Sequence, residues 1–418
     1  MVEYRIRKSQ LKGAIVVPSS KSQTLRAILF ASMAKGKSSI HKYLHSPDTD
    51  AMIEACRLLG AKIEVYPSSL NIEGLDGQIS HAEDVINAGN SGIVLRFCTA
   101  LGALASRPVV ITGDYSIRHQ RPMKELLSGL NQLGVSATSM RGDGYAPVII
   151  QGPLKQGHAL IQGSDSQPVS ALLIAAAFAK GPTQLTIENL GEKPWVLLTL
   201  DWFNRLGIAY EGTYLLPGLA SYSGFEYTVP GDLSSAAFPI AAALVTGSEL
   251  TVHNVNIDDI QGDKELIFIL QEMGAKIESE GSTLYVKKSV MNGLKIDINN
   301  FVDSLPILSV VACFAKGETH IHNAAICRDK ECDRIHAITA ELSKMGADIQ
   351  ELSDGLIIRN SILKGSNLHS YHDHRMAMAL TVAALGSHGE TFISPVECIA
   401  KTFPNFKEEF NRLGANIR

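Results

Sequence analysis

The apolar positions of the chain switch between helical and extended spacing in an order that recurs. In residues 264–273 they have the spacing of an amphipathic helix, and Gly274 follows at the place where a helix would end. Residues 275–279 then alternate between apolar and polar, Glu280-Gly281 indicates a turn, and residues 283–286 predict a returning strand. This stretch therefore predicts a helix followed by a β-hairpin.

The same pattern occurs six times along the chain. Each predicted helix ends in a Leu-Gly or Met-Gly pair, and successive pairs lie 67 to 74 residues apart. The glycines of the six pairs are Gly60, Gly134, Gly207, Gly274, Gly346 and Gly414. In five repeats another glycine ends an earlier Ala-rich helix before a β-branched strand. The near-even spacing indicates a repeated unit of helix, strand, helix, strand, turn, strand.

The two ends of the chain predict how the repeats group. The sixth repeat reaches residues 415–418 without its return strand, whereas residues 4–17 have spare strand character. We infer that this N-terminal segment completes the sheet of the sixth repeat. An α/β (α+β) fold with three repeats in each of two lobes is therefore expected. One lobe would span residues 19–229, and the other residues 1–18 plus 230–418.

Composition and charge exclude several classes of function. The chain is 45% hydrophobic and 19% charged, which is ordinary for a folded globular protein. The longest uncharged apolar stretch, residues 171–179, is about half of what a membrane span needs. Residues 1–10 lack the apolar core of a signal peptide, so we expect a cytoplasmic protein. A net charge of −4 argues against nucleic-acid binding, and the six cysteines contain no C-x-x-C pair.

Polar residues open the first predicted helix of every repeat. They lie in Ser20-Lys21-Ser22, Asn90-Ser91-Gly92, Asp165-Ser166-Gln167, Asp232-Leu233-Ser234-Ser235, Asp303-Ser304 and Asp373-His374-Arg375. Ser, Asn and Asp cap helix N-termini by accepting backbone N–H hydrogen bonds, and capping alone explains most of these residues. A metal site formed by the histidines that flank Asp373 is the less favoured alternative.

Capping does not explain the cations of these and other segments, because positive charge opposes the helix dipole at an N-terminus. The cations are Lys21, Arg26, Arg96, Arg118, Arg121, Lys330, Arg334, Arg375 and Lys401. Together with free backbone N–H groups they indicate a binding site for small molecules that carry several phosphates or carboxylates.

Seven segments resemble signatures of the 3-phosphoshikimate 1-carboxyvinyltransferase (EPSP synthase) family, in the family's order. They are residues 18–26, 89–96, 121–123, 230–237, 328–334, 373–377 and 400–404. The most specific are the Lys-Glu-x-Asp-Arg, Asp-His-Arg-Met-Ala and Ala-Lys-Thr-Phe-Pro segments. The resemblance implies a two-lobed inverse α/β barrel, built from the six repeats, that closes on its substrates.

Members of this family join phosphoenolpyruvate to a hydroxyl of shikimate 3-phosphate and release phosphate, in the shikimate pathway of aromatic amino acid biosynthesis. The resemblance implies that phosphoenolpyruvate is bound by Lys21, Gly92, Arg121, Arg334, Arg375 and Lys401. It implies that the acceptor is bound by Lys21, Ser22, Arg26, Ser166, Gln167, Asp303 and Lys330. The implied catalytic residues are Asp303, Glu331, Lys330 and Lys21. No metal or cofactor is implied, and we expect a monomer with small-molecule substrates, no nucleic acid and no membrane.

The chemistry independently requires two of these roles. Attack on the vinyl carbon needs an acid near the methylene group and a base near the acceptor hydroxyl. Asp303 is the candidate base and Glu331 the candidate acid, while fixed Lys and Arg side chains would neutralise the leaving phosphate. For Asp303, the alternative is a buried or capping residue.

Four positions depart from the family pattern. Asp165 and Glu192 stand where the family has serines that bind the acceptor's phosphate, and Ile93 and Ile326 replace the usual Thr and Asn. Two carboxylates facing a phosphate would repel it in a partly dehydrated site. The alternatives are therefore the same reaction on a different, unphosphorylated ring acid, or a non-catalytic anion-binding homologue. Nucleotide-end chemistry, as in the RNA 3′-phosphate cyclases with a related repeat, is disfavoured by the acidic net charge.

Overall fold

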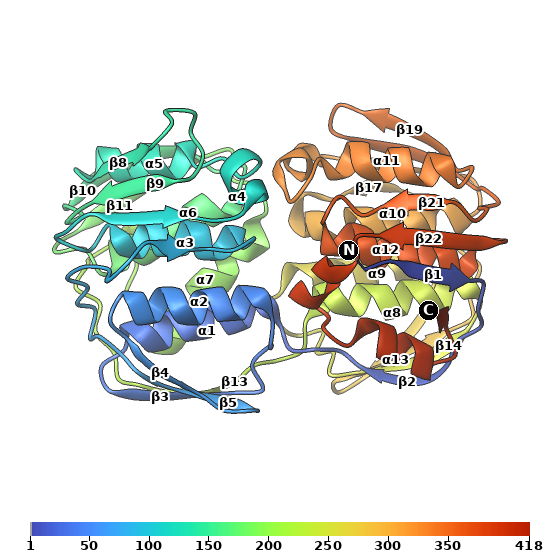
Figure 1. The fold of residues 1–418 in the computed structure, drawn as a ribbon, viewed down its shortest axis with the longest axis horizontal. Helices are drawn as coiled ribbons and strands as arrows, with labels where there is room; N and C mark the ends of the chain where they lie inside the picture. The colour runs from blue at the N-terminus through green and yellow to red at the C-terminus, as the bar shows by residue number, and fades with distance from the viewer. Residues whose placement is uncertain (1) are drawn as a thin grey trace. The chain divides into compact units, whose positions relative to one another are not determined.

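The computed structural model describes residues 2–418 as a mixed α/β protein that divides into two compact units (Figure 1). The first unit, Ser19–Val229, is here called the N-terminal unit. The second, the C-terminal unit, combines Pro230–Arg418 with the segment that ends at Pro18. Within residues 2–418, no helix has both the length and the apolar character needed to cross a membrane.

One order of elements recurs through both units, and the fifth repeat shows it clearly. Its elements are β17 (Lys295–Asp297), α10 (Leu305–Phe314), β18 (Glu318–His322), α11 (Arg334–Lys344), β19 (Asp348–Leu352) and β20 (Gly355–Arg359). They form a sheet of order β17-β18-β20-β19, in which β17 runs parallel to β18 and the other pairs are antiparallel. The short parallel strand of this repeat, β17, precedes α10 and was not predicted, because three residues are too few to show a period.

The other repeats of the C-terminal unit follow this order. The fourth contains β2 (Lys12–Val16), α8 (Leu233–Thr246), β14 (Glu249–His253), η1 (Gly262–Lys264), α9 (Glu265–Glu272), β15 (Lys276–Glu280) and β16 (Thr283–Lys287). The fifth also has the 3-10 turns η2 (Asn299–Ser304) and η3 (Ala325–Asp329). The sixth contains β1 (Tyr4–Arg7), β21 (Asn367–His369), α12 (His374–Gly386), β22 (Glu390–Ser394), η4 (Glu397–Lys401), α13 (Phe406–Arg412) and β23 (Asn416–Ile417).

The N-terminal unit has three repeats of the same kind. The first contains α1 (Lys21–Met33), β3 (Lys37–His41), α2 (Pro47–Leu58), β4 (Lys62–Val65), β5 (Ser69–Glu73) and, from the end of the unit, β13 (Glu226–Thr228). The second contains β6 (Ile86–Asn87), α3 (Gly92–Gly102), β7 (Val109–Thr112), α4 (Tyr115–His119), α5 (Lys124–Gln132), β8 (Ser136–Ser139) and β9 (Val148–Gln151). The third contains β10 (Gly157–Gln162), α6 (Ser166–Ala177), β11 (Thr183–Glu188), α7 (Lys193–Leu206) and β12 (Leu215–Leu216).

The N-terminal segment divides between two sheets. β1 lies between β22 and β23 and pairs with both in antiparallel fashion, which places it in the sheet of the sixth repeat. We expected β2 in the same sheet, but it pairs in parallel with β14 of the fourth repeat. The four residues of β1 already fill the gap between β22 and β23, so the strand that follows is left to pair with another sheet.

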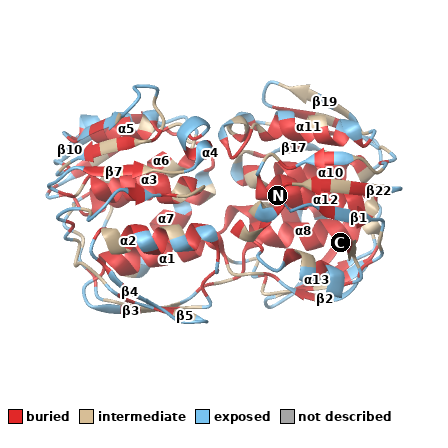
Figure 2. Ribbon diagram, viewed as in Figure 1, coloured by how far each residue is buried: buried red, intermediate tan, exposed pale blue. Residues whose placement is uncertain are grey.

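The first helices of the repeats form the buried core of each unit (Figure 2). In the C-terminal unit α8, α10 and α12 pack against one another, and in the N-terminal unit α3 packs against α6. In α12, every residue from His374 to Leu385 is buried, and alanines supply much of its surface. Small side chains allow close helix packing, while the second helix of each repeat buries only one face, as Ile335, Ile338 and Leu342 do in α11.

Candidate functional site

A buried arginine at the start of α11 organises the polar residues of the C-terminal unit. The guanidinium of Arg334 donates to Asp373 Oδ2 at 2.7 Å, to Asp303 Oδ1 at 2.7 Å and to Glu331 Oε2 at 2.8 Å. Burial alone would lower the pKa of Arg334, but Asp373, Glu331 and Asp303 raise it well above its ordinary value. One fixed cation therefore holds three carboxylates that come from different parts of the unit.

Both carboxylate oxygens of Asp303 are engaged by arginines. Arg375 Nη2 lies 2.9 Å from Oδ2, opposite the Arg334 contact with Oδ1. Burial by itself would raise the pKa of Asp303, but Arg375, Arg334 and Lys330 together hold it well below its ordinary value. Asp303 lies in η2 rather than at the cap position of α10, which Ser304 occupies, so its side chain does not serve as the expected cap.

Glu331 links Arg334 to the end of the sixth repeat. Its Oε1 accepts from Lys401 Nζ at 2.9 Å, while Oε2 faces Arg334. Glu331, Lys401 and the neighbouring Lys330 are all buried, with exposed fractions of 6% to 7%. The carboxylate therefore lies between two cations in a dehydrated environment, where charge–charge interactions are strong.

The start of α12 is fixed by Asp373, which has two roles. Its Oδ1 caps the helix by accepting from the backbone N–H groups of Arg375 at 2.8 Å and Met376 at 3.3 Å, and its Oδ2 binds Arg334. Tyr371 and His372, with φ of +58° and +57°, form the strained turn that leads into this cap. Capping, the expected structural role of Asp373, thus occurs together with an ion pair to Arg334. Among residues 2–418, no three His, Cys, Asp or Glu side chains could hold a metal ion.

In the N-terminal unit, the start of α3 is surrounded by polar groups from other repeats. A Cβ atom added at Gly92 would lie 2.9 Å from Arg96 Nη1, 3.1 Å from Gln167 Oε1 and 3.7 Å from Arg121 Cζ. These are closer than ordinary side-chain contacts, except for the last. Ser91 caps α3 and also donates to Asp48, which lies 3.5 Å from Lys21 Nζ.

The two unexpected acidic residues of this unit have partners. Asp165 Oδ2 lies 3.1 Å from Nη2 of the fully buried Arg96, which also donates to Gln167 Oε1 at 2.8 Å. Glu192 Oε2 accepts from the backbone N–H of Ser166 at 3.1 Å and from its hydroxyl at 3.2 Å. The negative charge expected to repel a phosphate is therefore matched by a cation in the case of Asp165, and Glu192 supports the start of α6.

Arg26 is buried, and no carboxylate in residues 2–418 pairs with it. Its guanidinium donates to Thr199 Oγ1 at 3.1 Å and to the carbonyls of Ser22 and Trp195, both at 3.3 Å. It lies 5.1 Å from the centre of the Phe97 ring, and burial lowers its pKa to about 9. A buried cation with only neutral partners favours the approach of an anion.

The structure brings the residues singled out in the sequence into one group in each unit. In the C-terminal unit the group contains Asp303, Lys330, Glu331, Arg334, Arg375 and Lys401. In the N-terminal unit the start of α3 gathers Gly92, Arg121 and Gln167, and Ser166 lies beside Gln167 at the start of α6. Lys21 and Ser22 lie at the start of α1.

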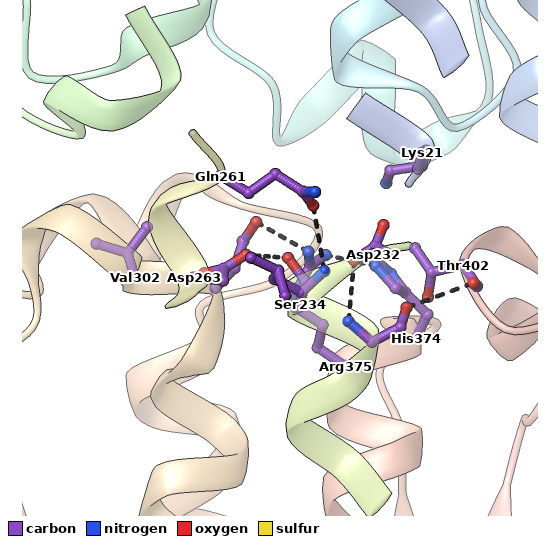
Figure 3. A network of polar contacts seen from close by, with 12 residues as sticks. Lys21, Asp232, Ser234, Gln261, Asp263, Val302, His374, Arg375 and Thr402 are labelled. Atoms are coloured by element: carbon purple, nitrogen blue, oxygen red, sulfur yellow. Dashed lines mark hydrogen bonds and ion pairs between the residues drawn. The ribbon is translucent and has the colours of Figure 1, made fainter. Parts of the chain in front are cut away.

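Sequence reasoning missed two polar residues of these groups, Asp48 and Asp263, and it missed the pairing of Arg96 with Asp165 and Gln167. Asp263 is a buried carboxylate in η1 that contacts Ser234 Oγ (Figure 3). Asp48 and Asp263 lie at or just before the second helix of their repeats, the place that Arg121, Glu192 and Glu331 have in theirs. Comparison of the repeats at that position was the signal that could have found them.

The chain is similar throughout to proteins of one family. Residues 6–410 match the sequence model described as "EPSP synthase (3-phosphoshikimate 1-carboxyvinyltransferase)". The 3-phosphoshikimate 1-carboxyvinyltransferase of Chlamydia abortus is 46% identical over 424 residues, which cover 100% of this chain and 95% of the relative. That of Acetivibrio thermocellus is 44% identical and covers 99% and 98%. A solved EPSP synthase from Acinetobacter baumannii has a TM-score of 0.82 and 29% identity, and covers 100% and 99%.

Proposed function

Because the chain belongs to the EPSP synthase (3-phosphoshikimate 1-carboxyvinyltransferase) family, we propose that it transfers the enolpyruvyl group of phosphoenolpyruvate to a hydroxyl of shikimate 3-phosphate. One observation of the chain itself carries the proposal. Two carboxylates suited to move protons, those of Asp303 and Glu331, are both bound to the guanidinium of Arg334. The reaction needs one such group for the acceptor hydroxyl and another for the methylene carbon.

Phosphoenolpyruvate supplies anionic oxygens that can replace the present partners of the cations. Arg375 and Lys401 each hold a carboxylate at 2.9 Å. We propose that these two cations bind the phosphate and carboxylate of phosphoenolpyruvate. Arg334, Lys21, Arg121 and the backbone beside Gly92 would contribute to the same binding. Charge-assisted hydrogen bonds from Arg and Lys then neutralise the leaving phosphate.

The same exchange of partners activates the base. When Arg375 turns to the substrate, Asp303 loses one of the three cations that keep its pKa low, and its proton affinity rises. Asp303 can then accept the acceptor's hydroxyl proton while the oxygen bonds to the vinyl carbon. Lys330, buried nearby, stabilises the charge that Asp303 carries before it takes this proton.

Glu331 is the proposed acid for the methylene carbon. It donates a proton to make a methyl group as the new C–O bond forms, and takes one back when the bond to phosphate breaks and phosphate leaves. Glu331 therefore enters the reaction protonated and is protonated again at its end. The proton taken by Asp303 passes to the departing phosphate, so atoms and charge balance without a metal or a redox cofactor.

The acceptor is proposed to use residues of the N-terminal unit. Arg26 and Ser22 would bind its carboxylate, Gln167 would lie against its ring, and Ser166 and Lys21 would bind its other polar groups, with Asp303 and Lys330 at the reacting hydroxyl. The two units would act as the lobes of an inverse α/β barrel, residues 19–229 and residues 1–18 plus 230–418. The enzyme would work in the cytoplasm as a monomer.

Phosphate release with two acceptors tests this proposal. The protein is incubated with phosphoenolpyruvate and either shikimate 3-phosphate or unphosphorylated shikimate, and inorganic phosphate is measured. We expect release with shikimate 3-phosphate and little with shikimate, because Arg96 matches the charge of Asp165.

Two outcomes would contradict the proposal in different ways. Release with the unphosphorylated acid alone would mean that Asp165 and Glu192 select a different acceptor. Binding of phosphoenolpyruvate without turnover on either acid would favour an anion-binding homologue with no catalytic activity.

A further inference from the structure

Asp263 is a buried carboxylate whose position none of the proposed roles explains. One of its oxygens accepts from the hydroxyl of Ser234 on α8, and the two side chains point toward each other in Figure 3. The other oxygen, Oδ1, is buried and has no hydrogen-bond partner within residues 2–418. A buried acceptor that lacks a partner costs free energy, so its retention calls for a reason other than stability.

The surroundings of Asp263 connect it to the proposed base. Its turn, η1, packs against η2, which carries Asp303, and against α8 and α9. The charged groups that face it are Asp303 from η2, Arg375 from α12 and Asp232 at the start of α8. Arg375 is also the partner of Asp303 Oδ2, at 2.9 Å, so one guanidinium acts on both carboxylates.

This arrangement makes Asp263 an acid that titrates near neutral pH. Burial and the charge of Asp303 raise its pKa from the ordinary 3.8 to about 7, against the opposing effects of Arg375 and the Ser234 hydrogen bond. Asp232 raises it further. Below this pH the side chain is neutral, and above it a second negative charge lies beside Asp303.

We propose that Asp263 is a positioning residue for the base: its protonation state sets the charge that η1 places beside Asp303, and hence how readily Asp303 accepts the hydroxyl proton. This rests on the role proposed above for Asp303. With Asp263 neutral, no like charge from η1 acts on Asp303, which is then a weaker base. With Asp263 charged, Asp303 is next to a like charge, which raises its proton affinity.

A titrating Asp263 and a purely structural Asp263 predict opposite effects of its substitution on the stability of the folded protein at high pH. The folded-state pKa of Asp263 is raised, so its contribution to stability is present below pH 4 and is lost as the pH rises from about 4 to about 7. An asparagine has the same shape and no charge to bury. Asp263→Asn should therefore stabilise the folded protein above pH 7, which a residue retained for packing would not do.

The test is the pH dependence of kcat for Asp263→Asn between pH 5.5 and 9. Asp258→Asn is the matched control, since Asp258 is an exposed residue of the segment before η1. For the wild type and the control we expect kcat to rise with a midpoint near pH 7. For Asp263→Asn we expect that rise to be absent and kcat at pH 8.5 to be about 3- to 10-fold lower.

Two further measurements do not depend on the absolute value of kcat. The Tm of Asp263→Asn should exceed that of the wild type by several degrees at pH 8.5, with a gap that closes toward pH 4. Ser234→Ala removes a hydrogen bond that lowers the pKa of Asp263, and should shift the midpoint of the kcat profile to higher pH.

The outcomes separate this inference from the proposed function. If the wild type turns over but the Asp263→Asn profile has the same shape, the inference is wrong and the function stands. If Asp263→Asn is less stable than the wild type at pH 8.5, Asp263 has a structural role and the inference is again wrong. If the wild type releases no phosphate with any acceptor, both fail together.

Discussion

Arg334→Leu should destabilise the folded protein by about 3–5 kcal/mol at pH 7, because it leaves buried carboxylates without their cation. Asp373 and Glu331 are almost fully buried, and both contact the Arg334 guanidinium at 2.7–2.8 Å. Leucine fills much of the space but provides no hydrogen bonds. Urea denaturation followed by circular dichroism measures the loss.

The loss should depend on pH in a defined direction. Asp303 has a lowered folded-state pKa, so its pairing contributes stability that is present above its ordinary pKa and is lost as the pH falls below about 4. The difference between the wild type and Arg334→Leu should therefore shrink toward low pH.

Arg328→Leu is the matched control for this prediction. Arg328 lies six residues earlier and pairs with Asp333 and Glu351, but its side chain is 28% exposed. Partly exposed ion pairs contribute about 0–1 kcal/mol. Equal losses for the two variants would mean that the Arg334 group has no special energetic role.

The second large effect is expected at Asp303. Asp303→Asn should lower kcat by about 100- to 10,000-fold, the range for removal of a general base, while the KM for phosphoenolpyruvate changes little. Asparagine keeps the shape and can accept a hydrogen bond from one of the two arginines through its single oxygen, but it cannot take the hydroxyl proton. Steady-state phosphate release at saturating substrates gives kcat directly.

Asp297→Asn controls for a general effect of the substitution. Asp297 is an exposed residue at the end of β17, shortly before η2, and it accepts a hydrogen bond from the side chain of Asn323. It should retain wild-type kcat. If Asp303→Asn kept its activity, Asp303 would have only a structural role, as a buried or capping residue, and another group would be the base.

The hairpins were predictable because their patterns are local. Residues 275–286 alternate between apolar and polar around Glu280-Gly281, and β15 and β16 are found there, with α9 before them. The shortest of the parallel strands that open the sheets were not predictable in this way. β6 has two residues and β17 three, and such segments are strands only because a longer neighbour offers them hydrogen bonds.

The candidate site was predictable where a residue type that is unusual in its place, such as a cation at a helix start, indicates a binding role. Lys21 and Arg375 were found because a cation at a helix start opposes the helix dipole, and Arg334 because it lies in another segment where cations recur. What these cations hold in the absence of substrate depends on tertiary contacts. The sequence indicated an unopposed charge at Asp165, whereas Arg96, from another repeat, lies 3.1 Å from it. The same limit concealed Asp263, whose chemistry arises from burial and from neighbours distant in sequence.

In the proposed mechanism, phosphoenolpyruvate replaces carboxylate side chains as the binding partner of fixed cations. Titration calorimetry of phosphoenolpyruvate into the wild type and Arg375→Ala, without an acceptor so that no turnover occurs, tests it most directly. We predict that the variant binds phosphoenolpyruvate about 2–5 kcal/mol more weakly, because a buried charge partner is lost. An unchanged affinity would show that phosphoenolpyruvate does not bind at this cluster, and would contradict the account.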